Sequence, residues 1–135
     1  MEELETAQCY ISRSEVDGYG VFARTRIPAG TRISEFTGVE MSYQDFKAKY
    51  GNDYTFTYQR RPYWLSWIVA KEKRNLITYV NDGYFGKAPN YHNCILQRKW
   101  LVSIREIEPG EELLLQYPKN YFTNKGKSKK VARED

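Results

Sequence analysis

Short stretches along the chain alternate hydrophobic with polar positions, and each stretch is bounded by glycine, proline or charged residues. This period of two is typical of half-buried β-strands. Three stretches lie in the N-terminal part of the chain and three in the C-terminal part. We predict strands over residues 9–13, 21–26, 31–37, 93–98, 100–104 and 113–116. The last two N-terminal strands are separated by a Pro-Ala-Gly turn, and residues 98–99 form the turn of a C-terminal hairpin.

One segment has helical spacing instead. Residues 42–51 begin with Ser42, carry an acid at Asp45 and close with Gly51. A serine cap followed three residues later by an acidic residue favours a helix start, and a glycine favours a helix end. We predict one short helix here, within a chain that is otherwise β-dominated.

The middle of the chain is rich in aromatic residues. Tyr54, Phe56 and Tyr58 alternate with threonine, which predicts a strand with all three rings on one face. A turn over residues 59–62 then leads into a second strand over 63–69. The shared aromatic face is either part of the core or the wall of a pocket.

Length and composition limit the architecture. At 135 residues the chain has room for one ordinary domain, which we place at residues 1–123. Residues 124–135 form a basic tail that we predict to be disordered. Its charge leaves a weak nucleic-acid contact as an alternative to a solvated end. No apolar stretch approaches the roughly 20 residues of a membrane span, so we expect no membrane association.

Cysteine and histidine are scarce. The chain has two cysteines, Cys9 and Cys94, and one histidine, His92. This composition excludes a disulfide framework and a zinc site of clustered cysteines, and we predict no metal. The acidic start lacks the basic region and apolar run of a secretory signal, which predicts an intracellular protein.

Three separated segments carry the clearest chemistry: Asp-Gly-Tyr-Gly-Val-Phe-Ala-Arg at 17–24, Tyr-Val-Asn-Asp-Gly at 79–83, and Glu-Pro-Gly-Glu-Glu-Leu-Leu-Leu-Gln-Tyr at 108–117. Each alone fits an ordinary turn or strand, and the strand pattern fits a sandwich or a barrel equally well. In this order and spacing the segments resemble the SET domain, the fold of S-adenosylmethionine-dependent protein lysine methyltransferases. The resemblance covers residues 11–122 and is to minimal members without zinc-binding flanks, such as the small viral SET proteins. It implies a β-clip-like arrangement of several small sheets, mainly β with short helices, and a knot-like C-terminal threading.

The resemblance also implies roles for individual residues. Glycines in the first segment let the backbone approach the cofactor closely. Residues after the last segment either cover the adenine or anchor the C-terminus. The implied cofactor contacts are Gly18, Tyr19, Gly20, Asn81, Asp82, Tyr121 and Phe122.

Tyr117 matches the tyrosine most closely tied to catalysis in the family. The predicted substrate channel is lined by Tyr54, Phe56, Tyr58 and Leu115. An apolar channel suits methyl transfer because a lysine with an ordinary pKa of about 10.4 must lose its proton before it can attack. Leu115 carries no hydroxyl that would hold a water or crowd the amine, which favours di- or trimethylation over strict monomethylation.

The sequence departs from the family pattern at three positions. Asp82 stands where histidine is usual, Val69 where aspartate is common and Thr78 where arginine is common. These departures motivate an alternative, a catalytically inactive SET-like module that binds a peptide or a scaffold partner. A third alternative is a basic nucleic-acid-binding β-domain. Asn90 and Asn93 both fit part of the motif that continues after Asn81, and both stay candidates.

The implied cofactor is S-adenosylmethionine, which leaves as S-adenosylhomocysteine, and the implied partner is a protein or peptide lysine, with a histone tail as the main candidate. A chromatin-modifying enzyme of a eukaryote or virus would act in the nucleus. A homodimer stays an alternative to a monomer, because small members without accessory segments can complete their sites by pairing.

Overall fold

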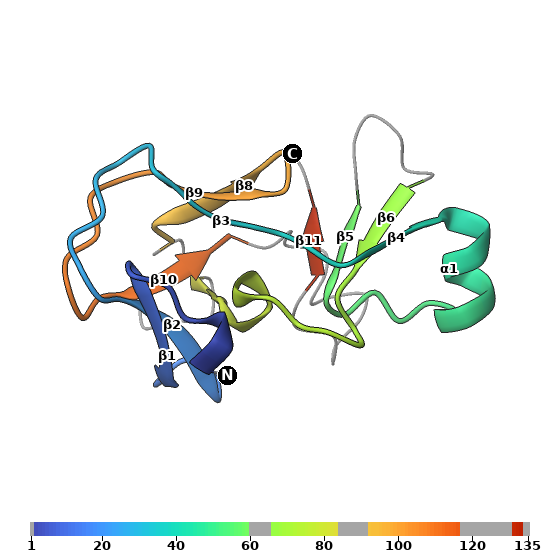
Figure 1. The fold of residues 1–135 in the computed structure, drawn as a ribbon, viewed down its shortest axis with the longest axis horizontal. Coiled ribbons are helices and arrows are strands. Elements are labelled where there is room, and N and C mark those ends of the chain that lie inside the picture. The colour runs from blue at the N-terminus through green and yellow to red at the C-terminus, as the bar shows by residue number, and fades with distance from the viewer. Residues whose placement is uncertain (1, 60–65, 84–91, 117–130, 134–135) are drawn as a thin grey trace.

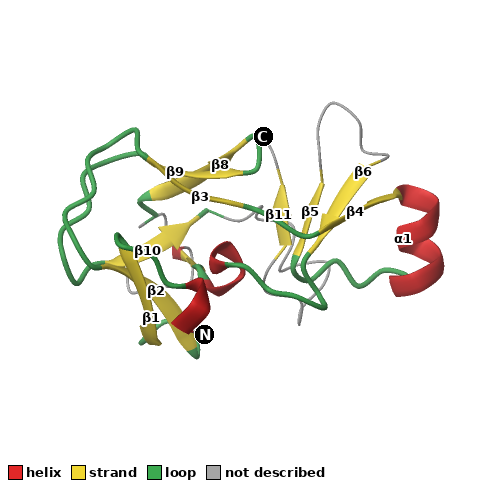
Figure 2. Cartoon of the chain, viewed as in Figure 1, coloured by secondary structure: helices red, strands yellow, loops and turns green. Residues whose placement is uncertain are grey.

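A computed structural model describes residues 2–59, 66–83, 92–116 and 131–133 of the chain. These residues form short strands with little helix, as the sequence predicts (Figures 1 and 2). The strands are β1 (Cys9–Arg13), β2 (Tyr19–Ala23), β3 (Arg32–Glu35), β4 (Val39–Ser42), β5 (Thr57–Gln59), β6 (Ser66–Val69), β7 (Asn81–Asp82), β8 (Cys94–Gln97), β9 (Trp100–Ser103), β10 (Glu112–Leu115) and β11 (Val131–Arg133). The helices are α1 (Tyr43–Tyr50) and 3-10 helices over Glu2–Leu4 and Leu76–Tyr79.

The strands form two sheets that lie side by side in Figure 1. The larger sheet has the order β1-β2-β10-β8-β9-β3, with β7 paired to β10 off this path. The smaller sheet has the order β11-β5-β6-β4, and α1 lies at its outer end (Figure 1). Strand β10 therefore lies inside the larger sheet, between elements from the beginning and the middle of the chain.

The helix α1 forms where its caps predict it. The Ser42 hydroxyl accepts a hydrogen bond from the Asp45 backbone N–H at 3.1 Å, and the Gly51 N–H donates to the Lys47 carbonyl at 3.0 Å. These bonds satisfy backbone groups that a helix end would otherwise leave unpaired. Phe46 is the buried residue of the helix, and its ring stacks on Trp67 of β6 with centroids 5.2 Å apart.

The hydrophobic core divides into two clusters. The main cluster fills the larger sheet and the 3-10 helix before β7, with Val21, Ile77 and Leu113 almost completely buried. A smaller cluster of Phe46, Trp67 and Val69 packs α1 on the smaller sheet. Burial of such side chains is worth about 1.5–3 kcal/mol each, so the main cluster is the larger source of stability.

Two loops cross at the end of the larger sheet. Ile27 and Ile107 are both fully buried and form a reciprocal backbone pair, with N–H to carbonyl distances of 2.8 and 2.9 Å. One loop follows β2 and the other precedes β10. The crossing therefore fixes where β10 enters the sheet next to β2.

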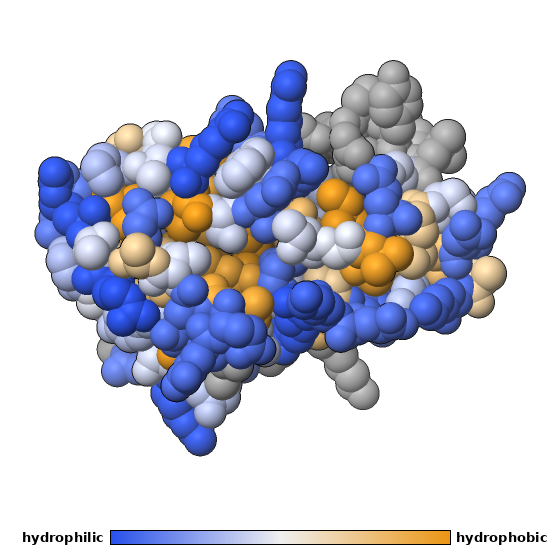
Figure 3. Space-filling model, in the orientation of Figure 1, coloured by the Kyte–Doolittle hydropathy of each residue, from blue (hydrophilic) through white to orange (hydrophobic). Residues whose placement is uncertain are grey.

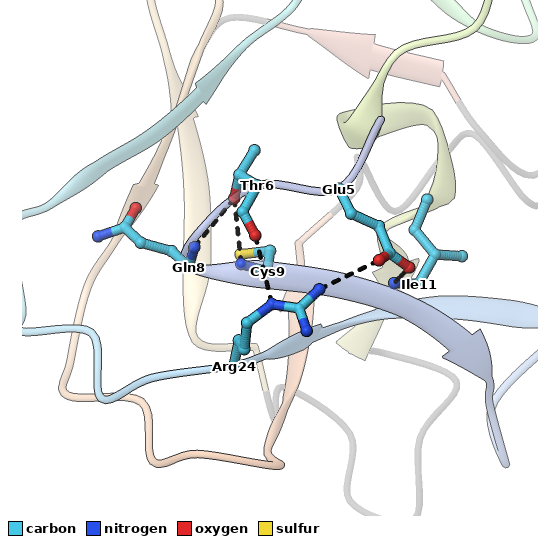
Figure 4. A network of polar contacts seen from close by, with 6 residues as sticks. All are labelled: Glu5, Thr6, Gln8, Cys9, Ile11 and Arg24. Atoms are coloured by element: carbon cyan, nitrogen blue, oxygen red, sulfur yellow. Dashed lines mark hydrogen bonds and ion pairs between the residues drawn. The ribbon is translucent and has the colours of Figure 1, made fainter. Parts of the chain in front are cut away.

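A polar network holds the N-terminal segment against the larger sheet (Figure 4). The Arg24 guanidinium contacts the Glu5 carboxylate at 3.1 Å, and the same carboxylate accepts the Ile11 backbone N–H at 2.9 Å. The Thr6 hydroxyl accepts the backbone N–H of Cys9 at 3.1 Å. These bonds link the start of the chain to β1 and to the end of β2.

Several predicted boundaries need correction. Strand β1 and helix α1 match their predictions, but β4 and β11 were not predicted. Val131–Arg133 lies in the tail that was expected to be disordered, yet it forms a strand on β5. The rest of the tail, the turn expected at 59–62 from residue 60 on, and the expected knot-like threading after Gln116 lie outside the described residues.

On the face shown in Figure 3, hydrophobic surface is divided into small areas between polar and charged side chains. Among the described residues, the exposed large hydrophobic side chains are Tyr19, Val39, Tyr43 and Ile104. Val39 and Tyr43 lie in the adjoining elements β4 and α1, and the other two lie elsewhere in the sequence. Within the described parts of the chain, every helix is too short or too polar to cross a bilayer.

Candidate functional site

The three sequence segments singled out above meet at strand β10. Glu112 and Leu113 pair antiparallel with β2, opposite Phe22 and Val21. Leu114 and Leu115 pair parallel with β7, opposite its two residues Asn81 and Asp82. The glycine turn before β2, the asparagine of β7 and the last motif are thus neighbours in space, although they lie far apart in the sequence.

Asn81 is the centre of this junction. Its side chain is 1% exposed, and its amide Nδ2 donates to the carbonyls of Asp17 at 3.0 Å and Tyr19 at 3.1 Å. The same nitrogen lies 3.0 Å from Oε2 of Glu112. Because the Nδ2 side of the amide faces these acceptors, its orientation is fixed and Oδ1 faces the other way.

The Glu112 carboxylate is held from two sides. The Ser14 hydroxyl lies 2.8 Å from both carboxylate oxygens, and the Asn81 amide donates to one of them, Oε2. A Cβ atom at Gly20 would lie 2.2 Å from Oε2 of Glu112, so no larger residue fits there while the carboxylate keeps its place. Gly20 thus gives the carboxylate room beside the backbone of β2.

Sequence reasoning missed Ser14 and Glu112 as parts of this junction. Glu112 lies inside the matched motif, and an acid at the start of an otherwise apolar strand is a usable signal, because such a charge needs a partner. Ser14 gives no comparable signal, since a serine just after a strand is ordinary turn chemistry.

The predicted aromatic of the first motif faces outward. Tyr19 is 41% exposed, and the Arg13 guanidinium lies over its ring at 5.6 Å. Its carbonyl, by contrast, points to Asn81. Gly18 has a positive φ of 49°, a conformation that favours glycine. The turn therefore presents backbone carbonyls to the junction and leaves the tyrosine ring at the surface.

Asp82 lies beside Asn81 in β7 and is only 6% exposed, opposite Leu115 of β10. Leu115 is 1% exposed and belongs to the main core cluster. Asp82 is therefore a buried acid whose backbone lies next to Leu115, two residues before the end of the last motif. The next residues of interest, Tyr117, Tyr121 and Phe122, lie outside the described residues, as does Asn90.

Asn93 has a clear structural task. It is fully buried, its Nδ2 donates to the Glu112 carbonyl at 2.9 Å, and its Oδ1 accepts the Leu114 N–H at 2.8 Å. Its own backbone N–H donates to the Leu114 carbonyl at 2.9 Å. The Asn93 side chain thus pairs with backbone groups of β10 that would otherwise need a neighbouring strand. These bonds hold β10 next to β8.

The aromatic stretch does not form the predicted strand face. Strand β5 begins only at Thr57, because Phe56 has a φ of 54° and breaks the extended conformation. Tyr54 consequently packs with Phe46 at a centroid distance of 5.2 Å in the smaller cluster. Tyr58 is 1% exposed in the main cluster. The prediction that the three rings share one face is wrong.

Phe56 instead belongs to a stacked arrangement with Arg74. The guanidinium lies 4.0 Å from the centroid of the Phe56 ring and 3.9 Å from that of Tyr79. The guanidinium also donates to the Thr78 hydroxyl at 3.1 Å and carbonyl at 2.8 Å. A cation thus lies next to Thr78, three residues before β7 begins at Asn81.

The two cysteines are unsuited to nucleophilic chemistry. Both are fully buried, and burial raises the pKa of Cys9 to about 11 and raises the pKa of Cys94 further still. A thiol is reactive as its thiolate, which these sites disfavour. Among the described residues, no group of three or more histidine, cysteine or acidic side chains could hold a metal ion.

Comparison with known sequences identifies relatives across most of the chain. The family model of the SET domain matches residues 18–118. The variant-silencing SET domain-containing protein of Plasmodium falciparum is 24% identical over 131 residues, covering 84% of this chain. The histone-lysine N-methyltransferase Set2 of Drosophila melanogaster is 27% identical over 126 residues, covering 81%. The matched region is 5% of the length of each of these two relatives.

Solved structures show the same fold. The methyltransferase domain of human PR domain-containing protein 2 superposes with a TM-score of 0.63 at 24% identity, covering 87% of this chain and 84% of that one. A chain of the polycomb repressive complex 2, in its active, stimulated state, gives a TM-score of 0.66 at 22% identity, covering 83% of this chain and 15% of that one. At these identities the likeness establishes the fold, whose mainly β character and several sheets match the sequence prediction.

Proposed function

The chain belongs to the SET domain family, and on that premise we propose that it is an S-adenosylmethionine-dependent protein lysine N-methyltransferase. The observation that carries this proposal is the junction of the glycine turn, Asn81 and Glu112 beside β10. The three segments of the resemblance converge there, through hydrogen bonds from the Asn81 amide to two backbone carbonyls of the first segment and to the Glu112 carboxylate of the last.

The chemistry of the junction fits such a cofactor. Backbone carbonyls of the turn, the Asn81 amide and the carboxylates of Asp82 and Glu112 make the region rich in acceptors and negative charge. An ammonium or a sulfonium is favoured by such surroundings. Bound S-adenosylmethionine supplies a methyl group on a positively charged sulfur, which an amine can displace directly.

We assign the following tasks to the chain's own residues. Gly18 leaves the turn before β2 open, so that its backbone can contact a ligand, and Gly20 leaves room for the Glu112 carboxylate beside β2. Asn81, fixed through Nδ2, offers Oδ1 as an acceptor for an ammonium. Asp82 contributes a buried negative charge beside it. Holding polar groups in place before a ligand arrives lowers the cost of reorganisation during the reaction.

Catalysis itself we assign to Tyr117, with Tyr121 and Phe122 over the adenine. Tyr117 follows β10 by two residues, so its place in the sequence is directly after the acceptor-rich junction. Its hydroxyl would align the lysine amine in a water-poor channel, where desolvation lowers the pKa of the amine. Among the residues predicted to line the channel, Phe56 is half-buried. Tyr58 and Leu115 are core residues, and they would shape the channel by supporting the side chains that line it.

We further propose a histone tail as substrate and the nucleus as the place of action. The name of the Drosophila relative, a histone-lysine N-methyltransferase, supports this choice. Leu115, which lacks a hydroxyl, supports di- or trimethylation as the outcome.

Calorimetric titration with S-adenosylmethionine and S-adenosylhomocysteine tests the proposal. We expect saturable binding by the wild-type chain, weakened about tenfold or more by Asn81→Ala because a fixed acceptor for a charged group is lost. Tyr117→Phe should retain binding. The control Asn52→Ala, in an exposed loop away from the junction, should bind like wild type.

Activity is then measured by mass spectrometry of histone H3 and H4 peptides incubated with cofactor, where Tyr117→Phe should lose methylated product. A folded chain that binds neither compound at millimolar concentration, with or without peptide, would contradict the proposal. The departures at Val69, Thr78 and Asp82 would then favour the inactive peptide-binding module.

A further inference from the structure

Arg74 connects two separate segments of the chain. Its guanidinium lies 4.0 Å from the centroid of the Phe56 ring, just before β5, and 3.9 Å from that of the Tyr79 ring, at the end of the 3-10 helix before β7. Its Nε donates to the Thr78 hydroxyl at 3.1 Å, and its Nη2 donates to the Thr78 carbonyl at 2.8 Å. Both rings pack against the main core cluster. One side chain therefore fixes the segment before β5 relative to the segment before β7.

Phe56 has a strained backbone in this arrangement. Its φ of 54° lies in the left-handed region, which is uncommon for a bulky residue. Such a conformation persists only where the surroundings hold it, and strained residues cluster at functional sites. The Phe56 carbonyl accepts the Ala70 N–H at 2.8 Å, and Nζ of Lys71 donates to the hydroxyl of the neighbouring Thr55 at 3.0 Å. These bonds fix the backbone near Phe56, and the contact with Arg74 fixes its ring.

Arg74 itself does not belong to the predicted site. Its bonds to Thr78 lie three residues before Asn81. Asn81 has its own anchors, which are the Glu112 carboxylate and two backbone carbonyls of the glycine turn. The contact with Phe56, by contrast, reaches the predicted channel, because this half-buried ring is part of the predicted lining.

We propose that Arg74 is a positioning residue, which holds the Phe56 ring in place relative to β7 and so keeps the substrate channel aligned with the cofactor contacts of that strand. Misplacement by about 1 Å can slow a reaction that depends on alignment by about 100-fold. The effect on catalysis rests on the proposed methyl transfer, whereas the positioning of Phe56 does not.

A guanidinium suits this task better than other side chains. Its flat faces stack on rings while the N–H groups at its edge donate in the same plane. A lysine ammonium is a point charge without a plane, and methionine has no donor. Thr78 stands where arginine is common in the family, and here a guanidinium from four residues earlier lies against it. The chain thus departs from the family pattern at residue 78 and brings a guanidinium to that residue from Arg74.

The first test needs no cofactor and compares backbone NMR signals of Phe56 among variants. Arg74→Met removes the charge and the donors, and Arg74→Lys keeps the charge. Lys73→Met is the matched control, because Lys73 is the exposed basic neighbour. In both Arg74 variants the signals of Phe56 should shift toward those of an extended residue, and in the control they should stay. Unchanged signals of Phe56 in the Arg74 variants would overturn the proposal.

The second test measures kcat and KM for the histone peptide that the wild-type chain methylates best, at saturating cofactor and at a temperature where circular dichroism shows every variant folded. We expect both Arg74 variants to lower kcat/KM by about tenfold or more, because the channel lining is displaced. The Kd for S-adenosylhomocysteine should stay close to that of wild type, because Asn81 keeps its own anchors. Ile27→Val removes one methyl group from the core and controls for lower stability alone, so it should keep the wild-type kcat/KM.

A double-mutant cycle tests whether Arg74 acts through Phe56. In a Phe56→Ala background, Arg74→Met should lower kcat/KM by less than about twofold further, because the ring that it positions is gone. A further loss as large as that in wild type would overturn the proposal, as would equal kcat/KM for wild type and Arg74→Met. A wild-type chain that methylates no peptide would contradict the proposed function instead, and the NMR comparison then decides by itself whether Arg74 positions Phe56.

Discussion

Substitution of Gly20 by alanine tests the junction most directly. The new Cβ would lie 2.2 Å from Oε2 of Glu112, 3.0 Å from its Cδ and 3.1 Å from Nδ2 of Asn81. Gly20 is not among the glycines with positive φ, so alanine adds a methyl group without strain in the backbone. The substitution therefore measures the space that the carboxylate needs.

The carboxylate can leave only by giving up its partners. Hydrogen bonds to a charged group contribute about 1.5–3 kcal/mol each, and overpacking costs about 1–3 kcal/mol. We therefore expect Gly20→Ala to lower the free energy of unfolding by about 2–4 kcal/mol. Urea denaturation followed by tryptophan fluorescence measures this change, and the displaced Asn81 amide should also weaken cofactor binding in the calorimetric assay.

A double-mutant cycle separates the clash from other effects. In a Glu112→Ala background the carboxylate is gone, so Gly20→Ala should cost less than about 1 kcal/mol there. Gly18→Ala is the matched control, because its Cβ would meet nothing within 4 Å. Its positive φ alone should lower the free energy of unfolding by about 1–2 kcal/mol in either background. If Gly20→Ala cost the same with and without Glu112, the reasoning about the junction would be refuted.

Four further predictions concern stability and burial. Asn93→Ala should cost about 2–4 kcal/mol in urea denaturation, because two buried backbone groups of β10 lose their partners; a cost no larger than that of an exposed alanine substitution would contradict this. Arg74→Met should cost about 1–2 kcal/mol through loss of the guanidinium between two rings, and Arg74→Lys should not recover it, as thermal denaturation can check. Because the pKa of Cys9 is raised from 9.0 to about 11, the unfolded chain loses its thiol proton first, and the free energy of unfolding should fall as the pH rises from 9 to 11. Cys9 and Cys94 should react with a thiol reagent only upon unfolding, and rapid labelling of the native chain would speak against their burial.

Local signals predicted the elements that depend on local interactions. Strand β1 has the predicted bounds, and α1 forms between Ser42 and Gly51 because both caps make the expected bonds. β7 could not be predicted in this way, since two residues are too few for a pattern. It exists because β10 pairs with it, and that pairing depends on the complete fold.

In the candidate site too, some residues could be found from local sequence signals, whereas others depend on the complete fold. Gly18, Gly20 and Asn81 were found from the sequence because they belong to motifs, and the structure brings them together. Ser14 was missed because its partner, Glu112, lies at the other end of the chain. A hydrogen bond between such distant residues leaves no periodic signal in the sequence, so only the fold reveals it.

In the aromatic stretch of residues 54–58, one backbone angle makes the prediction from alternation wrong. Alternation predicts a shared face only while every residue is extended, and Phe56, with φ at 54°, is not. The chain turns there, and Tyr58 enters the core with its ring 5.7 Å from that of Phe36. Its hydroxyl accepts the Lys99 N–H at 2.9 Å, while the Lys99 carbonyl accepts the Phe36 N–H at 2.7 Å. Tyr58 thereby joins β5 to the turn between β8 and β9 and connects the two sheets.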